Sequence, residues 1–61
     1  MNYKTATVDE LADYVEISSV QRITQQLMYH RSKGHEDIVE KIKAARAVVR
    51  KRKLIRLLET L

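Results

Sequence analysis

The sequence predicts an all-α protein with two short helices and one long C-terminal helix. Its 61 residues include no proline and a single glycine, Gly34. Because these are the residues that most often interrupt helices, long helices with short connections are expected. The only aromatic residues are three tyrosines, and a core of aliphatic side chains suits helix packing better than a β-sandwich. Apolar residues also recur at spacings of three and four, as they do along one face of a helix.

The first helix is predicted over residues 8–16. Thr7 stands three residues before Glu10, and this spacing is typical of a capping box, in which each side chain binds the backbone N–H of the other residue. Asp9 and Glu10 add negative charge where the helix dipole favours it. The apolar face would consist of Val8, Leu11, Ala12 and Val15.

The second helix is predicted over residues 19–33. Either Ser18 or Ser19 can cap its N-terminus. Gly34 would end it, because glycine readily adopts the left-handed conformation just past a helix C-terminus. The apolar positions of this helix are Val20, Ile23 and Leu27, with His30 next along the same face.

The third helix is predicted over residues 36–60, which would make it about 37 Å long. Its apolar face changes side along its length: a first stripe ends at Val49, and a second, roughly opposite, begins at Leu54. The helix therefore either kinks near Arg50–Lys53 or stays straight and presents its last leucines elsewhere. The predicted core is Leu11, Val15, Val20, Ile23, Leu27, Ile38, Ile42, Ala45 and Val49.

A chain of this length forms one domain and buries only roughly 60% of its unfolded surface, so a monomer would be marginally stable. It has no cysteine for a disulfide. We therefore expect a helical bundle completed by homodimerisation, in either orientation; the alternative is a frayed C-terminus with a few exposed leucines. The predicted dimer seam comprises Ala47, Leu54, Ile55, Leu58 and Leu61.

Charge is distributed unevenly. Residues 1–19 contain one lysine and four acids, a net charge of −3, whereas residues 41–56 contain eight basic residues and no acid, a net of +8. The basic run is predicted to contact nucleic acid, an acidic protein surface or an anionic membrane. Alternatively, it is a solvated helix that offsets the acidic head of its own or a neighbouring subunit. The candidate contact residues are Arg46, Arg50, Lys51, Arg52, Lys53 and Arg56.

Residues 7–27, TVDELADYVEISSVQRITQQL, resemble the helix-turn-helix of bacterial and phage DNA-binding proteins. The resemblance implies that Leu11 and Ala12 pack the first helix, that Ser18 caps the recognition helix, and that Arg22 lies near the major groove, together with Ser19, Gln21 and Gln25. Glu16 stands where that family carries its turn glycine. Two packed helices with a serine cap remain the alternative.

No catalytic, cofactor-binding or metal-ligating set is expected. His30 and His35 are five residues apart across Gly34, whereas paired helical ligands stand four apart. Neither a signal peptide nor a membrane span is expected, and the absence of cysteine is compatible with the cytoplasm.

The size, charge density and partial helix-turn-helix pattern resemble the small accessory proteins of bacteriophage early regions. This resemblance implies a regulatory protein, in the host cytoplasm, that acts by binding and takes no small-molecule substrate. Two hypotheses follow: a homodimer that docks on a host or phage protein, and a DNA-binding regulator that uses the basic helix.

Overall fold

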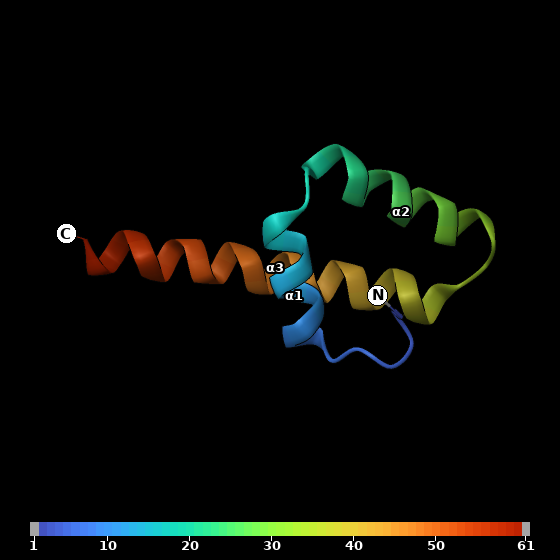
Figure 1. The fold of residues 1–61 in the computed structure, drawn as a ribbon, viewed down its shortest axis with the longest axis horizontal. Coiled ribbons are helices and arrows are strands. Elements are labelled where there is room, and N and C mark those ends of the chain that lie inside the picture. Colours follow the sequence, from blue (N-terminus) through green and yellow to red (C-terminus); the bar gives the residue numbers. More distant parts are fainter. Residues whose placement is uncertain (1, 61) are drawn as a thin grey trace.

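The computed structural model describes residues 2–60, and every regular element in that range is an α-helix. The helices are α1 (Val8–Ile17), α2 (Val20–Ser32) and α3 (Glu36–Glu59). Each boundary lies within one residue of the predicted one, so the prediction of an all-α chain with one long C-terminal helix is confirmed. Helix α3 runs without interruption or kink past Arg50 (Figure 1).

The helix ends form where the sequence predicts them. The backbone N–H of Glu10 donates to Thr7 Oγ1 over 3.1 Å, and the Glu10 carboxylate accepts from the Thr7 N–H in return. Ser19 caps α2 by accepting from the Arg22 N–H over 3.1 Å. Gly34 has φ 75°, which is the left-handed conformation expected after a helix.

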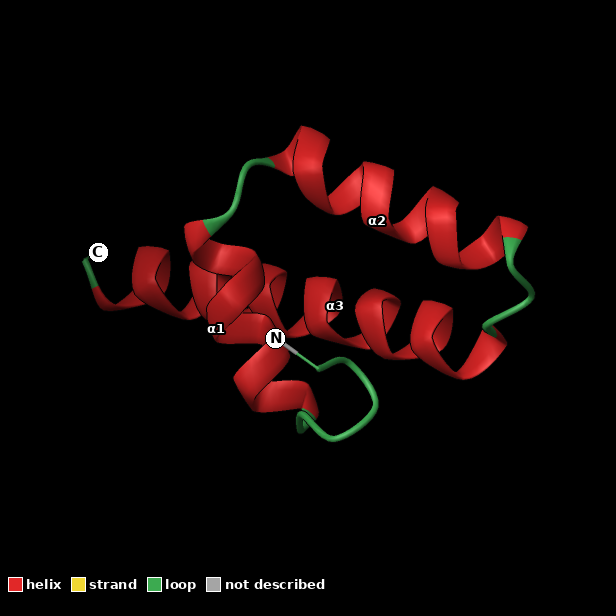
Figure 2. Cartoon of the chain, turned by 45° about the vertical axis from the view of Figure 1, so that its right-hand side comes forward, coloured by secondary structure: helices red, strands yellow, loops and turns green. Residues whose placement is uncertain are grey.

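Helix α3 is the element on which both other helices pack. Helix α1 crosses α3 near its middle, while α2 runs back along the N-terminal half of α3 (Figures 1 and 2). Helices α1 and α2 scarcely contact each other. The buried core therefore forms on one stripe of α3 and comprises Leu11, Ala12, Ile23, Ile38, Ile42, Ala45 and Val49.

Most of the predicted core is confirmed, but Val20 was placed wrongly. Its side chain is 76% exposed, whereas Ile23 is 2% exposed. The extended backbone at Ser18 and Ser19 carries the first turn of α2 away from α1, so α2 turns its Ile23 side towards α3 and leaves Val20 at the edge. Val15 and Leu27 are partly buried against the core.

The segment before α1 also packs on the helices. The Tyr3 ring meets Tyr14 edge-on at 6.4 Å between centroids, and His30 at 5.3 Å. Lys41 Nζ donates to the Tyr3 and Lys4 carbonyl oxygens over 2.9 and 3.1 Å. The residues before α1, which show no helical periodicity in the sequence, therefore help to cover the core.

The exposure of Val20 can be tested by truncating two neighbours on α2. Ile23→Ala should lower the free energy of unfolding by about 2–5 kcal/mol, because it empties a buried site. Val20→Ala is the matched control and should change stability by less than about 0.5 kcal/mol. Urea denaturation of both variants gives the comparison, and equal losses would contradict this placement of Val20.

The packing of Tyr3 predicts a loss of stability at alkaline pH. Burial, with the neighbouring Tyr14, raises the pKa of Tyr3 above its ordinary value. Its contribution to stability is therefore complete below about pH 10, the ordinary tyrosine pKa, and is lost as the pH rises through the raised pKa of Tyr3.

The test compares unfolding free energies at about pH 9 and pH 11. Tyr3→Phe should reduce the alkaline loss relative to the wild-type chain, whereas Tyr29→Phe, at a residue that is 54% exposed, should not. An equal alkaline loss in the wild-type chain and in Tyr3→Phe would show that Tyr3 has no part in it.

Candidate functional site

The C-terminal end of α3 projects beyond α1 and α2 (Figure 1). Its leucines are exposed: Leu54 by 58%, Leu57 by 63% and Leu58 by 63%. These three residues, called the leucine stripe below, share one side of the helix by their spacing. Ala47 is exposed on the same side, one heptad before Leu54. Three of the predicted seam residues, Ala47, Leu54 and Leu58, are therefore accessible on one side of α3.

The other two predicted seam residues are Ile55 and Leu61. Ile55 is 45% exposed, but its position is about 100° around the helix from Leu54, so it flanks the leucine stripe. Leu61 lies outside the described residues.

The side chains of the basic run, residues 41–56, make different contacts. Arg46 Nη2 donates to Thr24 Oγ1 over 3.1 Å and so ties α3 to α2. Arg52 and Arg56 form ion pairs with α1. Within residues 2–60, neither Lys51 nor Lys53 has an ion-pair partner, and neither does Arg50.

Four acidic and basic side chains join α1 to α3. Arg52 Nη1 lies 2.7 Å from Asp13 Oδ1 and 3.6 Å from Glu16 Oε2, and Arg56 Nη2 lies 3.0 Å from Glu16 Oε1. The hydrogen bond to Asp13 raises the pKa of Arg52 above its ordinary value. The acidic head thus offsets part of the basic helix within one chain, as one alternative proposed.

The spacing in the sequence contains a signal for these pairs. Asp13 and Glu16 are three residues apart and Arg52 and Arg56 are four apart, so each pair occupies one helix face. Arg52 and Arg56 also continue the face of Val49, at intervals of three and four. The stripe that packs on α1 therefore does not end at Val49 but changes from aliphatic to cationic.

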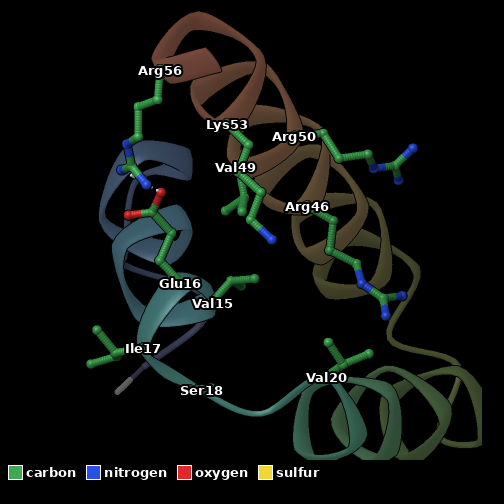
Figure 3. Close-up of a pocket in the computed structure, with 10 residues that line it drawn as sticks. All are labelled: Val15, Glu16, Ile17, Ser18, Val20, Arg46, Val49, Arg50, Lys53 and Arg56. Atoms are coloured by element: carbon green, nitrogen blue, oxygen red, sulfur yellow. Dashed lines mark hydrogen bonds and ion pairs between the residues drawn. The ribbon is translucent and has the colours of Figure 1, made fainter. Parts of the chain in front are cut away.

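A groove opens where the α1–α2 connection faces α3, and it is called the corner groove below (Figure 3). Its volume is about 730 Å³. Ile17 and Val20, at its edge, are 84% and 76% exposed. The apolar lining consists of Val15, Ile17, Val20 and Val49, and the basic lining consists of Arg46, Arg50, Lys53 and Arg56.

The sequence did not reveal this groove. Val20 was predicted to lie in the core, and Ile17 falls between the first two predicted helices, so neither residue was assigned to a surface. Of the predicted contact residues, the groove brings together four on α3, whereas Arg22 is not among its lining residues. Arg22 lies about 200° around α2 from Val20, and therefore on another side of that helix.

Two histidines meet despite a spacing that predicted no shared helical face. His30 Nδ1 and His35 Nδ1 are 3.0 Å apart, because the turn at Gly34 brings the residue before α3 back onto the end of α2. His30 is 9% exposed, as its place on the apolar face predicted. Within residues 2–60 no third histidine, cysteine or carboxylate joins them in a metal-binding group.

The connection between α1 and α2 can be compared with the turn of the helix-turn-helix that residues 7–27 resemble. Ser18 ends α1 and Ser19 caps α2, whereas the family pattern would place the cap at Ser18.

Between Asn2 and Thr60, no helix combines the length and the apolar composition needed to cross a bilayer. The chain matches no protein-family model, and comparisons with curated proteins and solved structures also find no match.

Proposed function

We propose that this chain is a small non-catalytic binding protein that docks on another protein as a homodimer. The observation that carries the proposal is the leucine stripe, which projects from the fold and lies 58–63% exposed. Leucines in this number on one side of a projecting helix are typical of a helix–helix interface. A regulatory role, like that of the bacteriophage accessory proteins it resembles, is part of this proposal.

The energetics favour a pair of chains. Burial of a leucine side chain is worth about 1.5–3 kcal/mol. A dimer buries the leucine stripe of both chains, so each leucine position contributes two side chains. Because the isolated fold is small, this gain is a large fraction of the stability that such a domain possesses. Dimerisation therefore stabilises the projecting half of α3, which gains little from α1 and α2.

The charges near the stripe favour an antiparallel pair. Arg50 and Lys51 lie about one turn before Leu54 on nearly the same side of α3. Two parallel helices would bring these cations together with their counterparts, at a cost in Coulomb energy. Antiparallel helices separate them by the length of the stripe, and we propose that arrangement.

Leu58→Lys should weaken the dimer. Two leucines are lost per dimer, worth about 3 kcal/mol, so the dissociation constant should rise by about 100-fold. Gln25→Lys adds the same charge at an exposed position on α2 and should leave the dimer intact. Sedimentation equilibrium measures both variants; a Leu58→Lys chain that stays dimeric would contradict this seam.

One observation supports a second candidate function, a DNA-binding regulator. Lys43, Arg46, Arg50 and Lys53 recur at intervals of three and four and so follow one side of α3 for about 15 Å. A row of cations of this kind can neutralise successive phosphates. Arg22, which the helix-turn-helix resemblance places near the major groove, lies outside this row.

A labelled mixed-sequence duplex, titrated at about 50 and 200 mM salt, distinguishes the candidates. The first proposal predicts weak binding that collapses at the higher salt. Tight binding that persists at 200 mM and falls in an Arg50→Gln variant would replace it with the DNA-binding function. Fluorescence anisotropy gives both affinities, and Lys33→Gln is the charge-matched control on α2.

A further inference from the structure

The corner groove combines two chemistries on one surface. Ile17 and Val20 face solvent with 84% and 76% of their surface, and they flank the only two residues that separate α1 from α2. Val15 and Val49 line the groove below them. Aliphatic side chains that stay this exposed beside a concave surface are typical of a binding site for apolar side chains.

The opposite wall of the groove is cationic. Arg46, Arg50 and Lys53 succeed one another along α3 at intervals of four and three, and therefore span about 10 Å. Arg46 extends towards α2, Lys53 reaches between α1 and α3, and Arg50 projects outward from α3 (Figure 3).

Glu16, the one carboxylate in the lining, is already engaged by Arg56 and Arg52. The groove therefore carries positive charge that the described part of the chain does not neutralise.

We infer that the corner groove binds an acidic amphipathic helix of a partner protein, with the partner's aliphatic side chains on Ile17 and Val20 and its carboxylates facing Arg46, Arg50 and Lys53. The inference rests on the proposed binding function and names the class of partner. Carboxylates one turn apart on a helix repeat every three or four residues, which is the interval of the three cations. The arrangement is that of a helix docked in a groove.

Both halves of the groove are needed to choose this partner. A nucleic-acid backbone or a free phosphate would satisfy the cations but would leave Ile17 and Val20 in water. A purely apolar segment would cover the valine and isoleucine but would remove water from the cations without compensation. A helix that carries leucines beside glutamates satisfies both.

The probe is a labelled helical peptide with leucine along one face and glutamate beside it. Two further peptides replace either every leucine with serine or every glutamate with glutamine. The parent peptide should bind, and each replacement should weaken binding by about tenfold or more. Equal binding of the serine peptide would overturn the inference, since it would mean attraction to charge alone.

Variants locate the site. Ile17→Ser and Val20→Ser should each weaken binding of the parent peptide by about tenfold, whereas Met28→Ser, at a 63% exposed position outside the groove, should not. Lys53→Glu should weaken it more than Lys33→Glu, which changes the net charge equally. Equal effects in either matched pair would overturn the site. Circular dichroism of each variant checks that it folds.

The same titration in Leu58→Lys separates this inference from the dimer. The groove belongs to a single chain, so the peptide should bind the Leu58→Lys variant as it binds the wild-type chain. Failure of the peptide to bind, while Leu58→Lys still loses the dimer, would overturn the groove alone. A duplex that displaces the peptide and binds more tightly would also overturn it, in favour of nucleic acid.

Discussion

The packing of α1 across one stripe of α3 is the contact on which the rest of the fold depends. Leu11 and Ala12 have no exposed surface, and they lie in one cluster with Ile42 and Ala45. A helix of ten residues is marginal in water by itself, so α1 exists because α3 covers its apolar face. Helix α2 adds Ile23 to the same cluster, and its own contact is likewise with α3.

The buried and the exposed surfaces of α3 differ in what they contact. One side buries aliphatic residues under α1 and α2 and continues outward as Arg52 and Arg56, which pair with Asp13 and Glu16. Exposed ion pairs contribute modestly to stability, but these pairs orient α1 on α3 beyond the core and neutralise part of the basic run. The exposed surface of α3 carries the cationic wall of the corner groove and, beside it, the leucine stripe.

Several features of the candidate site depend on the path of the chain between helices. The two extended residues between α1 and α2 leave Ile17 and Val20 exposed at the corner, and the turn at Gly34 brings His30 and His35 within 3.0 Å. A pattern of residues along one helix contains neither result. Only the angle at which one helix leaves another determines which side chains meet across a connection.

The sequence by itself determined the features that arise from local interactions. Thr7 with Glu10 specified one helix start, Gly34 specified a helix end, and spacing alone located the buried stripe of α3 and the leucines past Val49, because capping and periodicity act over one or two turns. The tertiary structure decided the exposure of Val20, the pairing of Arg52 with Asp13, and the corner groove. Arg52 and Asp13 alone are 39 positions apart, and all three features are set by how α1 and α2 pack on α3.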